Sequence, residues 1–167
     1  MKLTKIFFAF VALFMLACSS DKGSGSSSGG GKENWGVDGT VIGSWELISF
    51  NDVTNEAKPR VYLALYEDGS FDLYQQFTSI EWVHYKGTFN FDGTLLLGEY
   101  QDGKEWSTYS VEFATKPNVR MRLTRSNGSD VSVYTAVDEI PQAVVEEAKE
   151  PTTNAAPTRS MAVVPFL

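Results

Sequence analysis

The sequence has little of the chemistry that metal, redox and nucleic-acid-binding proteins need. Among its 167 residues there is one cysteine, Cys18, and one histidine, His84. A single cysteine excludes a disulfide within the chain and a thiolate metal cluster, and a single histidine excludes a multi-histidine zinc site. The 14 basic and 21 acidic residues give a net charge of −7, whereas phosphate binding needs a dense basic face. We therefore predict no metal, no cofactor and no nucleic-acid partner.

Catalytic motifs are also missing. The sequence contains no Gly-x-Ser-x-Gly nucleophile motif, no phosphate-binding glycine loop and no helix-borne histidine pair. His84 has no evident partner in the sequence, and the adjacent carboxylates of Glu67–Asp68 and Glu146–Glu147 fit solvated charge at a turn and on a helix face. We therefore expect that the protein is not an enzyme and has no catalytic residues.

The first 17 residues have the pattern of a removable leader. Lys2 and Lys5 precede an apolar run of 12 residues, Ile6–Ala17. That run is too short for a stable membrane-spanning helix, which needs about 20 residues, but it fits the charged and apolar regions of a secretory signal peptide. Without residues 1–17, 150 of the 167 residues remain, with 12 of the 14 basic residues and all 21 acidic ones, a net charge of −9. This length suits one domain with a core.

The leader stops on Leu16-Ala17-Cys18, followed by two serines. Small residues before a lone cysteine resemble the lipobox of bacterial lipoproteins, although Met15 stands where that family usually has leucine. The resemblance implies that the signal is cut before Cys18 and that Cys18 carries acyl chains, which would hold the protein on a membrane. An ordinary leader with an incidental cysteine is the alternative.

Residues 18–39 begin with a Gly/Ser-rich segment, which predicts a flexible tether between the lipid and the domain. Such tethers resemble those of outer-membrane lipoproteins. We therefore expect a lipid-anchored protein of the bacterial cell envelope, at the outer membrane. The sequence leaves open whether the domain faces the periplasm or the cell surface.

The rest of the chain alternates short apolar runs with turn signals, among them Asp68-Gly69, Asp92-Gly93, Asp102-Gly103 and Asn127-Gly128. Such dipeptides between alternating apolar residues are strong hairpin signals. We predict eight strands, at 41–50, 60–67, 70–78, 82–91, 94–100, 106–114, 118–125 and 131–137. Short connections favour antiparallel pairing of consecutive strands, and eight such strands close well into an up-and-down barrel. The predicted fold class is therefore all-β, an eight-stranded antiparallel barrel followed by a C-terminal helix.

The predicted strand at 60–67 is apolar on both faces, so its outer face needs a cover. Residues 140–149 read as a helix with Ile140, Val144 and Ala148 on one stripe, capped by Asp138 or Glu139 and with Pro141 in its first turn. This helix is the candidate cover. The tail, 151–167, ends on an apolar string that we expect to pack on the barrel, because a free apolar tail is unfavourable in water.

Gly43-Ser44-Trp45 on the first predicted strand resembles the Gly-x-Trp signature of the lipocalins. Together with the strand meander and the helix, it makes residues 40–150 similar to a lipocalin-like (calycin) domain. The resemblance implies that Trp45 closes the narrow end of the barrel. Lipocalins often place an Arg or Lys of the last strand over this Trp, but 131–137 contains neither, which leaves Arg122 or Arg125 as substitutes.

Two sets of residues are candidates for binding. The inward-facing candidates for a ligand cavity are Trp45, Leu63, Phe71, Leu73, Tyr85, Phe89, Tyr109 and Met121, with Val111 and Val133 beside them. The same rings could equally fill the barrel. The candidates for a rim or partner surface are Trp82 and Trp106, at strand starts, and Arg120 and Arg122, which could instead pair with Glu112 across the strands.

Two functions follow from these residues. The first is a lipid-anchored binding protein that takes a small apolar or amphipathic ligand into the barrel. The second is an accessory interaction protein of an outer-membrane complex, or a glycan-binding module, with a filled barrel. An interior cavity favours the first, whereas a filled barrel with Trp82 and Trp106 exposed favours the second.

Overall fold

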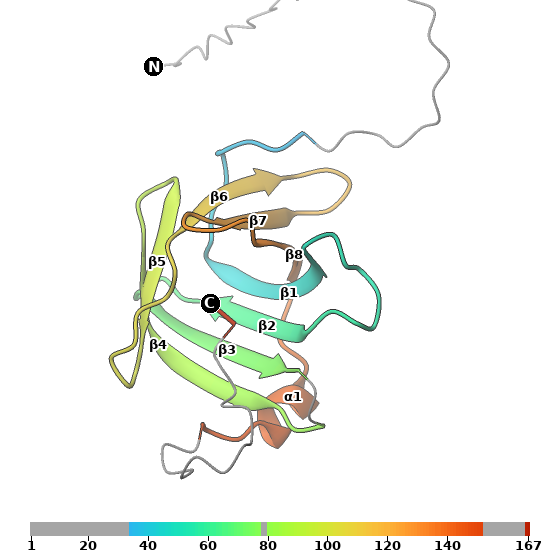
Figure 1. Ribbon diagram of the computed structural model, residues 1–167, viewed down its shortest axis with the longest axis vertical. Helices are drawn as coiled ribbons and strands as arrows, with labels where there is room; N and C mark the ends of the chain where they lie inside the picture. The colour runs from blue at the N-terminus through green and yellow to red at the C-terminus, as the bar shows by residue number, and fades with distance from the viewer. Residues whose placement is uncertain (1–33, 78–79, 152–165) are drawn as a thin grey trace, which may run out of the picture. The chain divides into compact units, whose positions relative to one another are not determined.

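The computed structural model describes residues 34–77, 80–151 and 166–167 of the chain. Eight antiparallel strands form one closed barrel in which each strand pairs with the next and β8 pairs with β1 (Figure 1). The strands are β1 (Gly43–Phe50), β2 (Arg60–Leu65), β3 (Ser70–Gln76), β4 (Val83–Phe91), β5 (Leu95–Tyr100), β6 (Tyr109–Ala114), β7 (Arg120–Arg125) and β8 (Val131–Val137), and one helix, α1 (Gln142–Glu147), follows them. The predicted fold class is confirmed.

Aspartate side chains fix the tight turns that the sequence indicated. Asp68 Oδ1 accepts hydrogen bonds from the main-chain N–H and the hydroxyl of Ser70. Asp92 Oδ1 accepts from the main-chain N–H groups of Thr94 and Leu95, and Gly93 supplies the positive φ of 101° that the turn needs. These short turns make consecutive strands neighbours in the barrel.

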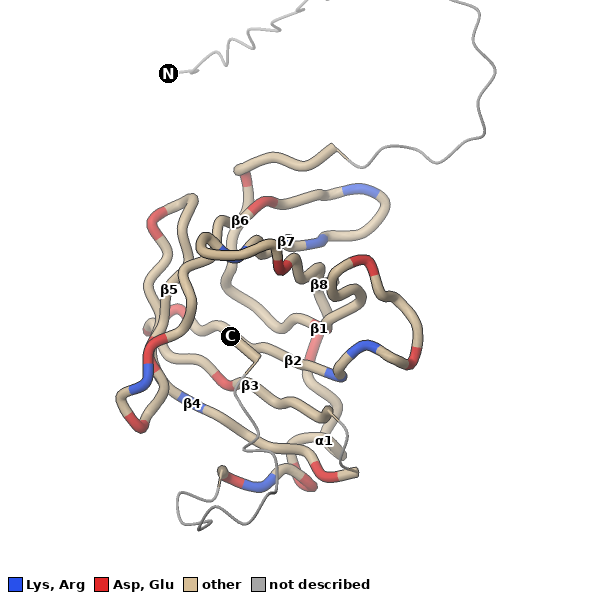
Figure 2. Tube along the Cα trace, in the orientation of Figure 1, with Lys and Arg blue, Asp and Glu red and all other residues tan. Residues whose placement is uncertain are grey.

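The barrel core follows from the alternation of side chains along each strand. Inward positions of neighbouring strands pair in register, as with Leu63 and Leu73 or Val111 and Leu123. Leu63, Leu73 and Leu123 are completely inaccessible to solvent. Charged residues of both signs are interspersed along the trace, on loops and on strands (Figure 2).

The outer face of β2 and β3 is covered as predicted. Val144 of α1 packs with Tyr62, Tyr74 and Trp82 in a second buried cluster outside the barrel, flanked by Ile140 and Ala148. The helix is shorter than the predicted 140–149: Pro141 is its N-cap, with no side-chain cap, and the backbone is already extended at Ala148. The expected capping by Asp138 or Glu139, and the expected place of Pro141 in the first turn, were therefore wrong.

The two ends of the barrel differ. At one end, Trp45 is buried and its Nε1 donates a hydrogen bond to the Val41 carbonyl at 2.8 Å, so the chain entering β1 covers the indole. The β1–β2, β3–β4, β5–β6 and β7–β8 connections leave the barrel at the other end, which we call the mouth.

Candidate functional site

The mouth of the barrel is occupied by the last two residues of the sequence, Phe166 and Leu167 (at C in Figure 1). The Phe166 main-chain N–H donates a hydrogen bond to Gln75 Oε1 on β3 at 2.8 Å. The Tyr100 hydroxyl on β5 donates to the Leu167 main-chain oxygen at 3.0 Å. Leu167 is buried with the core side chains, which agrees with the predicted packing of the tail on the barrel. The other residues of its apolar string, 161–165, lie outside the described residues.

Two further aromatic rings hold Phe166. Its ring meets that of Phe50, at the end of β1, edge-on with 5.1 Å between centroids, and that of Phe77, just after β3, at 6.1 Å. Phe166 is half-buried and Phe77 is exposed, so this aromatic group lies at the rim, with Leu167 deeper inside. The mouth thus combines an aromatic rim, a buried apolar position and two polar groups that contact main chain.

Several buried polar side chains lie within the barrel wall. Gln75 and Ser132 are buried, and so are the phenols of Tyr100, Tyr109 and Tyr134. Burial raises the pKa of all three tyrosines above the ordinary value, most strongly for Tyr134 and Tyr100. A tyrosine hydroxyl is protonated at physiological pH even at its ordinary pKa, and among these three that of Tyr100 donates to the occupant.

The structure places the predicted ligand-lining residues inside the barrel. Seven of them belong to the buried core, namely Trp45, Leu63, Phe71, Leu73, Tyr85, Tyr109 and Met121, together with Val111, and Phe89 packs against this core while half-buried. Val133 was placed on the wrong face: it pairs with the outward-facing Arg122, and its neighbours Ser132 and Tyr134 point inward. Gln75, which contacts the occupant, was not among the predicted site residues.

The barrel is closely filled around these residues. Leu63, Leu73 and Met121 have 0% of their surface accessible, so no water-sized space touches them. Leu167 packs in the same core cluster. Space for a ligand in the mouth therefore depends on displacement of Phe166 and Leu167.

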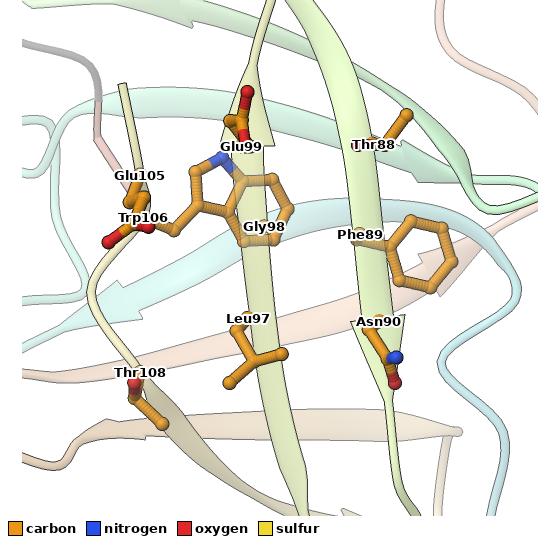
Figure 3. A pocket seen from close by; sticks show the side chains of 9 residues that line it. All are labelled: Thr88, Phe89, Asn90, Leu97, Gly98, Glu99, Glu105, Trp106 and Thr108. Atoms are coloured by element: carbon orange, nitrogen blue, oxygen red, sulfur yellow. The ribbon is translucent and has the colours of Figure 1, made fainter. Parts of the chain in front are cut away.

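The expectation that Trp82 and Trp106 are exposed at a rim was wrong. Trp82 is 4% exposed because α1 covers it, and Arg60 lies over its indole. Trp106 is 6% exposed because the chain before β6 folds back on β5. There the main-chain N–H of Trp106 donates a hydrogen bond to the Gly98 carbonyl at 2.7 Å. Its indole lies across β5 at Gly98, where a side chain would not fit (Figure 3), and its ring meets Phe71 at 4.5 Å.

Two shallow grooves flank β4 and share Thr88 and Glu99. One, of about 360 Å³, is lined by Trp106, Leu97 and Glu105 among others (Figure 3). The other, of about 480 Å³, includes Asp72 and Lys86.

Arg122 is engaged in the cross-strand ion pair that the sequence suggested. Its Nη2 and Nε contact Glu112 Oε2 at 2.5 and 2.8 Å, and its guanidinium lies 4.4 Å from the ring centroid of Trp35. Arg120 lies beside it on β7, opposite Ala114 and Thr135. Arg125 contacts Ser107 near the mouth. The Arg122 guanidinium thus contacts Glu112 and Trp35. Arg125 lies at the mouth, and Trp45 lies at the other end of the barrel.

His84 has a partner that the sequence did not indicate. Its Nε2 lies 2.5 Å from Asp72 Oδ1 across β3 and β4, and its ring stacks on Tyr74. The Tyr66 hydroxyl donates to the other Asp72 oxygen at 2.8 Å. The hydrogen bond with His84 and that from Tyr66 hold the pKa of Asp72 below its usual value. The arrangement ties β3 to β4 on the outer face of the barrel.

Comparisons of the chain with known proteins give no match. No family model, curated protein or solved structure matches the chain. Within residues 34–77, 80–151 and 166–167, no group of three His, Cys, Asp or Glu side chains could hold a metal ion, and no helix is long and apolar enough to cross a membrane. Cys18 and the predicted signal peptide and Gly/Ser segment lie outside the described residues.

Proposed function

We propose that this protein is a membrane-anchored, lipocalin-like lipoprotein of the bacterial cell envelope that binds a small apolar or amphipathic ligand in the mouth of its barrel. The observation that carries the proposal is the seating of Phe166 and Leu167 there. An apolar occupant with two polar main-chain contacts indicates a site that accepts amphipathic groups. Phe166 and Leu167 belong to no strand, so their displacement breaks no strand pairing.

The composition of the mouth supports a ligand with both apolar and polar parts. Phe50 and Phe77 offer ring faces, whereas Gln75 and Tyr100 offer polar atoms next to them. Ligand pockets in proteins commonly combine a mainly apolar lining with a few polar groups that fix orientation. The proposal includes no catalytic step and no cofactor.

The lipid anchor rests on the sequence around Cys18. Intact mass measurement of the protein extracted from bacterial membranes tests it. We expect a mature chain that begins at Cys18 and carries acyl chains. A chain with a free Cys18 thiol, or one that begins elsewhere, would contradict the anchor.

A filled barrel favours the second function, an accessory protein that docks on an envelope complex or a glycan with its outer surface. The complete burial of Leu63, Leu73 and Met121 supports this alternative. It predicts that no ligand enters the barrel whether or not Phe166 and Leu167 are in place.

Native mass spectrometry with palmitate separates the two functions. The mature chain with Cys18→Ser, which lacks an acylation site, is compared with the same chain carrying Phe166→Ser and Leu167→Ser. We expect a complex with one palmitate, more populated in the triple variant because the mouth is vacated. Absence of the complex in both chains would overturn the ligand-binding proposal and favour the accessory protein.

A further inference from the structure

The contacts of Phe166 and Leu167 specify more than an apolar ligand. Both residues are held through their main chain as well as their side chains. We infer that the barrel mouth is a peptide-binding site for an extended segment with an aromatic residue followed by an aliphatic one, and that Phe166 and Leu167 are its intramolecular competitor. The inference rests on the proposed function, because it names the ligand class of the same site.

The main-chain contacts separate a peptide from a fatty acid. Gln75 Oε1 accepts an N–H and the Tyr100 hydroxyl donates to an oxygen, at the two ends of one dipeptide. A peptide supplies both groups, whereas a free fatty acid supplies oxygens alone and leaves Gln75 Oε1 without this N–H. Gln75 is completely buried, and the loss of one hydrogen bond at a buried acceptor weakens binding.

The Tyr100 contact gives the orientation of a bound peptide. A tyrosine hydroxyl is protonated throughout the physiological pH range, so Tyr100 is a hydrogen-bond donor at this position. A donor at this position suits a carbonyl or a carboxylate oxygen of the ligand. It therefore fixes the direction of the peptide, with the N–H at β3 and the oxygen at β5.

The side chains set the order of the two residues. Phe166 lies at the aromatic rim between Phe50 and Phe77, where ring contacts favour an aromatic side chain. Leu167 is 7% exposed among the core residues, which suits a compact aliphatic side chain. A segment in the reverse order would place the aromatic ring in the filled interior.

Covalent attachment gives the competitor an advantage. A tethered segment acts at an effective concentration on the order of millimolar, so an external peptide must compete with it. When only a fraction of the molecules has a vacant mouth, the apparent affinity falls by that fraction. Loss of both apolar side chains should therefore strengthen external peptide binding by about tenfold or more.

The test is a fluorescence anisotropy titration of a labelled peptide with the sequence of residues 161–167, Met-Ala-Val-Val-Pro-Phe-Leu. The protein is the mature chain with Cys18→Ser, with and without Phe166→Ser and Leu167→Ser. A peptide of reversed sequence controls for nonspecific hydrophobic binding. A peptide N-methylated at its Phe removes the N–H donor without any change in the protein.

We expect saturable binding to the chain with a vacated mouth, at least about tenfold tighter than to the chain that keeps its Phe166 and Leu167. The reversed and N-methylated peptides should bind more weakly, as should the normal peptide to a vacated chain with Tyr100→Phe, by about 3- to 10-fold. Because Tyr100→Phe keeps the ring, its far-ultraviolet circular dichroism should match that of the parent chain.

The outcomes of the palmitate and peptide experiments distinguish the peptide inference from the proposed ligand-binding function. Binding of palmitate without binding of the peptide would overturn the peptide inference and leave the proposed function in place. Equal binding of all three peptides would also overturn the inference, since the mouth would then select only apolar surface. Binding of neither palmitate nor peptide to a folded, vacated chain would overturn both claims.

Discussion

Helix α1 should be held in place by one buried side chain, and Val144→Ala tests this. An isolated helix of six residues is not stable in water, so α1 depends on its packing against Tyr62, Tyr74 and Trp82. Val144 is 5% exposed. Removal of its two buried methyl groups costs about 2 kcal/mol, from about 0.8 kcal/mol per group plus the cavity that remains.

Val145→Ala is a matched control. It makes the same chemical change one residue later in the same helix, but Val145 is 45% exposed. Its effect on the free energy of unfolding should stay within about 0.5 kcal/mol. The comparison therefore isolates burial from helix propensity.

Urea unfolding followed by tryptophan fluorescence measures both variants, since Trp82 lies in the affected cluster. The midpoint of Val144→Ala should fall by about 1 M urea relative to the parent. Equal midpoints for the two variants would refute the packing of α1 on β2 and β3. That outer face would then be open to a partner, in favour of the accessory-protein function.

Two other predictions concern the β3–β4–β5 side of the barrel. Gly98→Ala places a Cβ 2.6 Å from the Trp106 ring and should destabilise the fold by about 1–3 kcal/mol in urea unfolding; an unchanged midpoint would mean that the indole does not lie over Gly98. Asp72→Asn removes a carboxylate whose pKa is lowered in the folded state, chiefly by His84. A carboxylate with a lowered folded pKa stabilises the fold above its unfolded pKa of about 4, and this contribution disappears as the pH falls through the folded pKa. Asp72→Asn should thus lose about 1 kcal/mol at pH 7 and less below pH 4, and a difference that persists at pH 2 would contradict the assignment.

The fold was predictable because its signals are local. The Asp-Gly turns and the alternating strands determine neighbouring pairs, and eight such strands close on themselves. The errors arose where a tertiary contact redirected the chain. The strand predicted from 106 begins at Tyr109, because Trp106 pairs with Gly98 of β5. The helix starts two residues late because the backbone at Pro141, its N-cap, is not helical.

The site was only partly predictable. The alternation of Phe71, Leu73 and Gln75 already places a glutamine on an apolar face, and an amide there signals an internal hydrogen-bond partner. That partner is Phe166, 91 residues away along the chain, and no local pattern connects the two. Trp82 was expected at the rim because it starts a predicted strand, but α1, a distant element, buries it.

The most direct test of ligand binding in the mouth is a set of intermolecular nuclear Overhauser effects. The sample is palmitate bound to the mature chain with Cys18→Ser, Phe166→Ser and Leu167→Ser. We expect effects between the acyl chain and the side chains of Tyr100 and Phe50, which contact Leu167 and Phe166 in the occupied mouth. Effects confined to the exposed side chains of Leu95, Leu97 and Val119 would place the acyl chain outside the barrel and contradict the account.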